Sequence, residues 1–295
     1  MKIDLHTHTN FSACANKENG WFELLCKAEK EKINILSITD HNTCLFHLLE
    51  KFVNITNFSG RIVPGIELDV VEDGVSFELL AYNFDVKKIF DWSFEKYGTI
   101  HTRQLKLKDK LVEAIKCNNL EIDEKNLIIG KTDYAHKSVY DNMIKFSKNC
   151  EVFEKYNIKN SSDFYRVSTE NKEFPVYVDT KLIWPDVSTV VNAIHNANGV
   201  VVLAHPYNYK DSVNVENLLK IAVEKGLDGI EVFHPSCNNE QAKYLLDFAN
   251  KNNLIITGGS DYHGTEKHNV LGLSEQDSNT VCKSCDLIIK PTRRE

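Results

Sequence analysis

Two histidines separated by a single residue close the first apolar run of the chain. His6 and His8 follow Ile3 and Leu5 in "MKIDLHTH". If this run is a strand, alternation places both imidazoles on the same face. Neighbouring imidazoles repel each other when protonated and gain little when neutral, unless a cation lies between them. The spacing is therefore a weak indication of a metal site, and it needs support from other parts of the chain.

Histidines and carboxylates also follow the other strand-like runs of the sequence. They are Asp40 and His41 after "INILSIT", Glu67 in "PGIELDV", His205 in "LAHP", His234 in "GIEVFHP", and Asp261 with His263 in "GGSDYHG". We predict that each lies at the C-terminal end of its strand. In parallel α/β folds these ends meet at one face, where active sites are built. Imidazoles and carboxylates gathered there suit zinc, manganese or iron, and can hold two or three ions.

Short strand-like runs alternate with amphipathic helical stretches up to about residue 83 and again from residue 186. This alternation is typical of βαβ units, whose parallel strands are covered by helices. Between residues 86 and 185 longer polar helical stretches such as "RQLKLKDKLVEAIKCNN" replace the strand signal. We therefore predict one α/β domain, residues 1–85 and 186–295, interrupted by a mainly helical insertion, residues 86–185.

The composition is that of a soluble globular protein. The chain has 295 residues, of which 42% are hydrophobic and 26% charged, and its net charge is −7. An acidic protein lacks the basic field that drives nonspecific binding to long duplex DNA, so a small or locally held substrate is favoured. No secretory signal and no apolar stretch of about 18 residues is present, so we expect a cytoplasmic protein that does not bind membranes. The pattern leaves the oligomeric state open.

The eight cysteines form no disulfide-like framework, and we expect them to stay reduced. Cys282 and Cys285 form a CxxC motif, but it has no second pair or neighbouring histidine with which to complete a zinc site. The role of this motif is left open.

Six motifs in order along the chain carry a resemblance to a known family. They are "DLHTHTNFS", "TDHNT", "PGIELDV", "LAHP", "GIEVFHPS" and "GGSDYHG". They resemble the polymerase-and-histidinol-phosphatase (PHP) family of metal-dependent phosphoesterases, especially its TrpH-like stand-alone members, which act on nucleotide-type phosphates. The resemblance implies a distorted (β/α)7 barrel, a trinuclear metal site, an insertion that partly caps it, and hydrolysis of phosphate esters.

The resemblance also assigns metal ligands. They correspond to His6, His8, His41, Glu67, His205, Asp261 and His263, with Glu67 as a bridging carboxylate. Asp40 is expected to support the neighbouring ligand. The predicted cofactor is two or three divalent ions of manganese, zinc or iron, because histidine and carboxylate ligands suit all three metals.

Two positions depart from the family pattern. Ala13 stands where the family often has an acidic ligand, and Glu78 stands in "VSFELLAY" where it usually has a histidine. We predict that Glu78 is a metal ligand, with Cys14 as the less favoured substitute for the acid missing at Ala13. These changes put the third ion in question more than the chemistry, because two ions suffice for hydrolysis.

Catalytic roles are predicted for two further histidines. His234 either binds metal or donates a hydrogen bond to the phosphate or the leaving group. His136 in "KTDYAH" resembles a histidine of the family's insertion, where relatives have "RPH"; Lys131 or Arg166 is the candidate for the missing positive charge. The predicted activity is hydrolysis of a phosphate monoester of a nucleotide-like small molecule or a short oligonucleotide end by a metal-activated water.

Other functions remain open at this point. One is a phosphatase of the histidinol-phosphate type, and another is a metal-dependent enzyme like the amidohydrolases, whose barrels also carry an HxH strand. A third is a noncatalytic metal-binding PHP module, which only Ala13 favours. Turnover of a phosphate ester would separate these functions.

Overall fold

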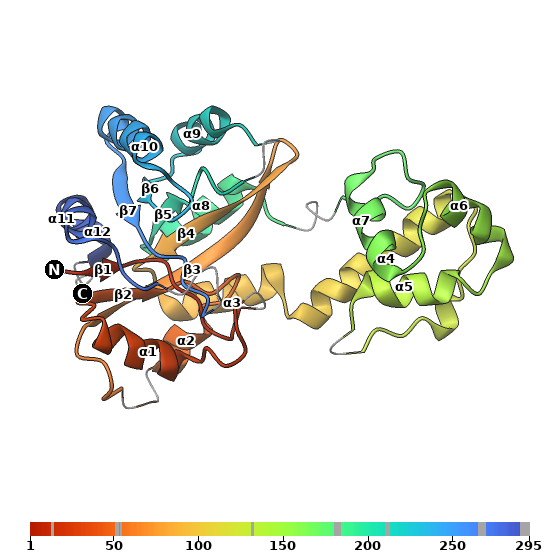
Figure 1. Cartoon of the computed structure of the whole chain (residues 1–295), viewed down its shortest axis with the longest axis horizontal. Coiled ribbons are helices and arrows are strands. Elements are labelled where there is room, and N and C mark those ends of the chain that lie inside the picture. Colours follow the sequence, from red (N-terminus) through yellow and green to blue (C-terminus); the bar gives the residue numbers. More distant parts are fainter. Residues whose placement is uncertain are drawn as a thin grey trace. The chain divides into compact units, whose positions relative to one another are not determined.

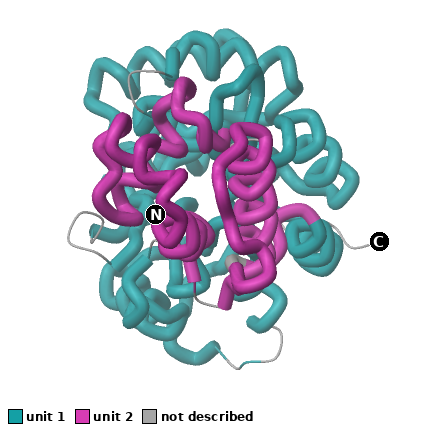
Figure 2. The backbone as a smooth tube through the Cα atoms, turned by 90° about the vertical axis from the view of Figure 1, so that its right-hand side faces the viewer, with its two compact units in different colours: residues 1–95, 184–295 teal, residues 96–183 magenta. Residues whose placement is uncertain are grey.

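The computed structural model describes residues 1–12, 15–50, 53, 55–130, 133–179, 184–209, 213–264 and 270–289. The chain folds into two compact units, which Figure 2 colours separately. Unit 1 comprises Met1–Glu95 and Trp184–Glu295, and unit 2 comprises Lys96–Ile183. The helix α3 (Val86–Tyr97) thus belongs almost wholly to unit 1, although the sequence alone assigned it to the insertion.

Unit 1 is built on a seven-stranded sheet whose order follows the chain (Figure 1). Its strands are β1 (Ile3–Asp4), β2 (Ile35–Ile38), β3 (Arg61–Glu72), β4 (Val75–Tyr82), β5 (Val200–Leu203), β6 (Gly229–Phe233) and β7 (Ile255–Gly258). All neighbours are parallel except β4, which runs antiparallel to both β3 and β5. The expectation of uniformly parallel strands is therefore wrong at "VSFELLAY". There, Asp73 and Gly74, with φ of 49° and 75°, turn the chain into a hairpin.

The first and last strands approach each other without a continuous ladder. Leu5 N donates to Gly258 O at 3.3 Å, and Thr7 forms a single parallel bridge with Tyr262. A side chain at Gly259 would put its Cβ 2.3 Å from that of His6, so only glycine permits this approach. The sheet is thus the distorted seven-stranded barrel that the family resemblance implied, left open between β7 and β1.

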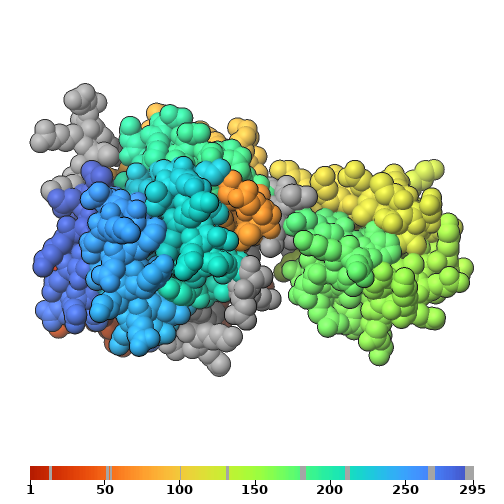
Figure 3. Space-filling model, turned by 90° about the horizontal axis from the view of Figure 1, so that it is seen from above, coloured from red at the N-terminus to blue at the C-terminus, as the bar shows by residue number. Residues whose placement is uncertain are grey.

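Helices cover the outside of this sheet. They are α1 (Trp21–Lys30), α2 (Leu45–Leu49), α3, α8 (Val187–Asn196), α9 (Val215–Glu224), α10 (Asn239–Asn252), α11 (Glu275–Ser284) and α12 (Asp286–Ile289). The face of unit 1 seen in Figure 3 is formed largely by the cyan and blue residues of α9 to α11. A capping box between Asn238 and Gln241 begins α10, and Asn253 in the left-handed conformation ends it.

Described residues of unit 1 form at least two apolar clusters. In one, strand residues such as Leu80 and Val202 pack with Val281 and Cys285 of α11 and its end. In the other, Leu24 and further α1 residues pack against β2. Cys285 is fully buried, and burial raises the pKa of its thiol to about 12. No cysteine belongs to any group of described side chains that lie close enough to share a metal ion.

All the regular secondary structure in the described part of unit 2 is helical. It contains α4 (Ile100–Cys117), α5 (Ala135–Met143), α6 (Cys150–Lys155) and α7 (Ser161–Glu170), with short 3₁₀ turns at Glu124–Asn126 and Ser147–Asn149. Thr99 and Asn160 cap the N-termini of α4 and α7 through their side chains. The unit has its own apolar core, which includes Leu111, Ile115 and Phe164. Across both units, none of the described helices is long and apolar enough to cross a membrane.

Candidate metal centre

The predicted metal ligands come together in unit 1, and the structure describes all eight of them. His6 and His8 follow β1, His41 follows β2, His205 follows β5, and Asp261 and His263 follow β7. Glu67 differs from the prediction, because it lies within β3 and not at a strand end. Glu78 lies within β4. The hairpin extends both strands, and the Glu67 position of β3 is bridged to His41.

The side chain of Glu67 lies at the middle of the cluster. Its Oε1 is 2.9 Å from His205 Nε2 and 3.3 Å from His6 Nε2. Its Oε2 is 3.1 Å from His41 Nδ1 and 3.3 Å from His8 Nε2. One buried carboxylate thus faces four imidazole nitrogens, two on each oxygen. This is the arrangement expected of a carboxylate that bridges two ions.

Asp261 supplies a second shared carboxylate. Its Oδ1 lies 3.2 Å from His8 Nε2 and 3.4 Å from both His6 Nε2 and His263 Nδ1. Burial alone would raise the pKa of Asp261, but the imidazoles of His6, His234 and His8 bring it well below its usual range. The residue has φ of 52°, a left-handed conformation that is rare outside glycine and that often accompanies functional sites.

Glu78 reaches the cluster from the neighbouring strand. Its carboxylate lies 3.6 Å from His205 Nε2 and 4.0 Å from His41 Nδ1. With His41 and Glu67 it forms a group whose ligand atoms could hold one ion. Burial and the charge of Glu67 raise the pKa of Glu78 to about 7. Ala13 and Cys14, the other positions weighed for this ligand, lie outside the described residues.

The protonation of His6 and His8 tests whether this donor set fits a metal. Ser12 Oγ gives its only hydrogen to Asp40 at 2.6 Å, so it must accept from His8 Nδ1 at 3.2 Å. His6 Nδ1 is held by Glu231 at 3.0 Å. The remaining nitrogens, both Nε2, face each other at 3.1 Å inside a fully buried site. Two converging lone pairs need a cation between them, and imidazole with carboxylate is a donor set that divalent metals prefer.

The titration of the metal-free cluster agrees with this geometry. Burial lowers the pKa of His6, but the carboxylates of Glu231, Glu67 and Asp261 outweigh it and raise the pKa well above the ordinary value. For His8, burial prevails and lowers the pKa to about 3. The two opposite shifts indicate that the pair would bind one proton and not two, and a metal ion would compete with that proton for the Nε2 atoms.

His234 follows β6 and faces the same cluster. Its Nε2 lies 3.5 Å from Asp261 Oδ2, and its ring centre is 4.9 Å from that of His205. The backbone N–H of Ser236 donates to its Nδ1 at 3.1 Å. Since Nδ1 accepts this bond, the neutral imidazole carries its hydrogen on Nε2. The side chain thus presents a proton donor, and not a lone pair, toward the carboxylates.

The residues predicted in the insertion lie in unit 2 or outside the described part. Lys131 is among the residues that the structure does not describe. Arg166 is exposed on α7 and lies 3.4 Å from Asp163. His136 is only 3% exposed, with its ring packed edge-on against Tyr165 and Phe164 in the core of this unit. Its predicted role in catalysis stays a prediction.

His136 should make the protein sensitive to mild acid. Burial lowers its pKa to about 4, whereas an unfolded chain keeps about 6.5. Between these values only the unfolded state binds the proton, so this contribution to stability is complete above pH 6.5 and is lost as the pH falls toward 4, by about 3 kcal/mol. Urea unfolding of wild type and His136→Leu between pH 4.5 and 7.5 measures the difference. Equal pH dependence in both proteins would contradict the assignment.

One residue of the site is missing from the sequence-based assignment. Glu231 is fully buried in β6, and both of its oxygens lie within 3.3 Å of His6 Nδ1. The signal that could have identified it is a glutamate inside the apolar strand "GIEVF", three residues before His234. A carboxylate is almost never fully buried without partners, so such a position implies a cation or donors nearby.

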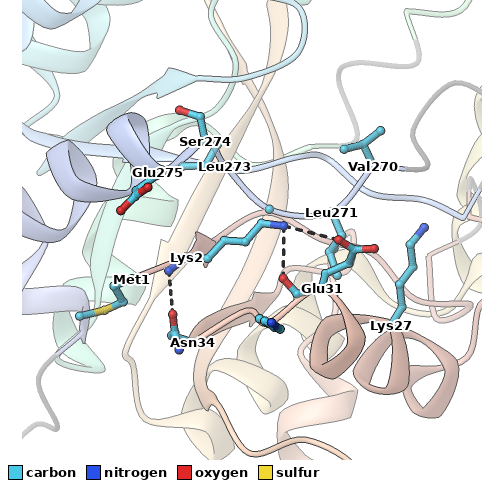
Figure 4. A pocket seen from close by; sticks show the side chains of 12 residues that line it. Met1, Lys2, Lys27, Glu31, Asn34, Val270, Leu271, Leu273, Ser274 and Glu275 are labelled. Carbon is cyan, nitrogen blue, oxygen red and sulfur yellow. Dashed lines mark hydrogen bonds and ion pairs between the residues drawn. The ribbon is translucent and has the colours of Figure 1, made fainter.

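A separate cleft of about 760 Å³ lies at the start of β1, between the end of α1 and Val270–Glu275 (Figure 4). In Figure 4 the Lys2 ammonium points to the Glu31 carboxylate at 3.6 Å and to the Glu31 carbonyl oxygen at 3.3 Å. None of the clustered histidines or carboxylates lines this cleft. This cleft is therefore separate from the residues that the sequence assigned to the metal site.

Comparison with known proteins shows that the chain is similar to phosphoester hydrolases. No family model matches it. It is 25% identical over 266 residues to a 5′-3′ exoribonuclease of Haemophilus influenzae, covering 89% of this chain and 90% of that protein. It is also 25% identical over 272 residues to the phosphoribosyl 1,2-cyclic phosphate 1,2-diphosphodiesterase of Eggerthella lenta, covering 90% and 95%.

Solved structures have the same fold. A metal-dependent phosphoesterase from Bifidobacterium adolescentis superposes with a TM-score of 0.58 at 24% identity, covering 97% of this chain and 98% of that one. An amidohydrolase from Chromobacterium violaceum, solved with sulfate and no metal, gives 0.59 at 21% identity, covering 93% and 91%. The solved structures confirm the predicted fold. The relatives in sequence confirm the predicted resemblance to phosphoester hydrolases.

Proposed function

We propose that this chain is a metal-dependent phosphoesterase that cleaves a phosphate ester at the end of a nucleotide-like molecule or a short oligonucleotide. The observation that carries the proposal is the carboxylate of Glu67 with four imidazole nitrogens within 3.3 Å. Such a group has no structural purpose without cations, because burial of so many ionisable groups is costly. The finer assignments below are part of the same proposal.

The ligands are proposed to hold two or three divalent ions of manganese, zinc or iron. They are His6, His8, His41, Glu67, Glu78, His205, Asp261 and His263. When bound, the ions would neutralise phosphate oxygens and lower the pKa of a water so that it can attack at neutral pH. The carboxylates of Glu67 and Asp261 each lie close to imidazoles from different strands, so that one ion could contact a carboxylate and an imidazole together. Both carboxylates are buried, so bulk water has little access to them.

His234 is proposed to donate the proton that the leaving oxygen needs. Its Nε2–H points into the cluster while Ser236 fixes the opposite nitrogen. A positioned acid of this kind typically contributes 10²–10⁴-fold to a hydrolysis. His136 is proposed as a second catalytic histidine, and Lys131 or Arg166 as phosphate contacts, on the family resemblance alone.

The substrate class is inferred from the relatives and from a cavity beside His234. The relatives' names describe cleavage of RNA from an end and of a cyclic sugar phosphate. The cavity measures about 570 Å³ and is lined by His234, Ala242, Lys243, Leu246 and Ser260, among others. Its size and its mixture of apolar and polar walls suit a nucleoside-sized group. We therefore include phosphodiesters beside the monoesters first expected.

The decisive experiment is phosphate or nucleotide release by protein reconstituted with manganese or zinc. The panel comprises nucleoside monophosphates, 3′,5′-bisphosphates, a cyclic sugar phosphate, histidinol phosphate and short single-stranded RNA, with His8→Ala as the inactive control. Release by the wild type alone supports the proposal, and the best substrate identifies the class. No release despite bound metal would favour a noncatalytic metal-binding module. We further propose that the protein is cytoplasmic and does not bind long duplex DNA.

The cavity beside His234 gives a prediction of its own. Ala242→Trp would fill part of the space in which a nucleoside group is proposed to bind. We expect KM for nucleotide substrates to rise about 10-fold with little change in kcat, because uniform binding is lost. Activity on p-nitrophenyl phosphate, which has no nucleoside, should stay within about twofold. Steady-state kinetics on both substrates measure the contrast, and equal losses on both would exclude the cavity as the nucleoside site.

A further inference from the structure

We propose that Glu231 is a positioning residue of the metal centre. Its carboxylate holds the imidazole of His6 and the backbone N–H of His205, so that the Nε2 atoms of both histidines face Glu67. The inference deepens the proposed function and rests on the same cluster. Neither the motif assignment nor the relatives' names give this residue a role. Its carboxylate joins two ligands that lie 199 positions apart, since 205 − 6 = 199.

The first contact sets the ring of His6. Glu231 Oε1 and Oε2 lie 3.0 and 3.3 Å from His6 Nδ1, and both residues are fully buried. An ionised carboxylate can only accept, so Nδ1 carries the hydrogen and Nε2 is free to face Glu67 at 3.3 Å. Carboxylates that hold the second nitrogen of a metal-binding histidine orient the ring and raise its basicity.

The second contact sets the backbone of His205. Its N–H donates to Glu231 Oε2 at 2.9 Å, and the residue has φ of 22°, which is unusual for a side chain other than glycine. Among the described residues, His205 Nδ1 has no hydrogen-bond partner that would orient the ring from its other side. The backbone is therefore what directs His205 Nε2 to its position 2.9 Å from Glu67 Oε1. Removing the Glu231 acceptor removes the bond that holds this strained backbone.

The residues around Glu231 are apolar neighbours in its own strand and histidines of the cluster. Its neighbours in β6, Ile230 and Val232, are fully buried apolar residues. Both carboxylate oxygens accept from N–H groups of ligand residues. Glu231 also forms a group with His6 and His234 whose ligand atoms could hold an ion, so the test below includes direct ligation as an outcome.

The test compares Glu231→Gln and Glu231→Leu with the wild type. Glutamine keeps one acceptor for His6 but places its amide N–H₂ near the N–H of His205 or His6, and leucine removes both acceptors. Glu224→Gln, an exposed change on α9 of the same unit, is the matched control. Manganese and zinc affinity and the number of ions bound are measured by calorimetry, without substrate. Long-range ¹H–¹⁵N spectra report the tautomer of His6, whose signals are identified by their loss in His6→Ala.

The expected result is graded. Glu231→Gln should weaken metal binding by about 10–100-fold with the number of ions unchanged, and Glu231→Leu should weaken it further and mix the His6 tautomers. Wild-type affinity and tautomer in Glu231→Leu would overturn the proposal, and loss of one whole ion would make Glu231 a direct ligand instead. If the leucine variant does not fold, the glutamine variant still decides through affinity and tautomer. Because no readout needs turnover, failure of the phosphoesterase assay in the wild type is distinguishable from failure here.

Discussion

Glu67→Gln is expected to lower kcat/KM on the best phosphate ester by on the order of 10³-fold or more. The side chain keeps its volume but loses its charge, and one of its two bridging oxygens becomes an N–H₂ group. If the N–H₂ group takes the place of Oε2, it faces the imidazoles of His8 and His41, which lie 3.3 and 3.1 Å from Oε2 in the wild type. An N–H₂ group cannot accept a hydrogen bond from these imidazoles or share a cation with them. In the other rotation the same conflict arises with His6 and His205 at Oε1.

The loss should be accompanied by a change in bound metal. We expect calorimetric titration of Glu67→Gln to show at least one ion fewer or a much weaker site. Glu72→Gln is the matched control, because Glu72 lies on the same strand and forms an ion pair with Lys225 away from the cluster. An active Glu67→Gln enzyme with a full complement of metal would disprove the bridging role. An inactive variant that binds metal normally would instead restrict Glu67 to the chemical step.

Removing the metal is expected to lower the melting temperature of the protein by roughly 10 °C. A ligand that binds only the folded state stabilises it by about 4 kcal/mol at a thousandfold excess over its Kd. For a unit of this size each kcal/mol corresponds to about 2–4 °C. The physical reason is that, without a bound ion, only protons on the imidazoles can balance the charges of the buried carboxylates of Glu67 and Asp261. Burial and the neighbouring charges favour a proton on His6 but disfavour one on His8.

Differential scanning calorimetry with and without a chelator measures this shift, and addition of manganese should reverse it. His8→Ala, which removes one ligand from the cluster, serves as the control and should respond less to the chelator. A melting temperature that is the same with and without the chelator would mean that the cluster is stable without ions. The metal would then be bound weakly or not at all, and the proposed function would lose its basis.

The sequence by itself determined where the ligands of the site occur. His6, His8 and His205 are recognisable because each follows a short apolar run, and the polarity of a parallel strand brings its C-terminal end to the common face. The alternation of strand-like runs with amphipathic helical stretches is likewise readable from periodicity. The structure has α1 in the first of the two predicted parts of the α/β domain, and α8, α9 and α10 in the second. These features depend on local sequence, so they needed no knowledge of the fold.

The tertiary structure determined which of these side chains lie around the same carboxylate. Glu67 lies inside a strand and not at its end, because β3 continues past it to the turn at Asp73 and Gly74 and pairs with β4 in an antiparallel hairpin. This hairpin also places Glu78 on the neighbouring strand. A single strand run does not reveal the direction of its neighbour. The pairing of Glu67 with four imidazoles therefore could not be read from the sequence.

Burial was the other quantity that sequence alone could not supply. Glu231 is recognisable as part of the site only in the structure, where its fully buried carboxylate contacts His6 and His205. His136, assigned to catalysis from a motif, proved to be packed in the apolar core of unit 2. Residue type and spacing determined the chemistry available to this chain. Partners far apart in sequence determined which charges are desolvated, and only folding brings those partners together.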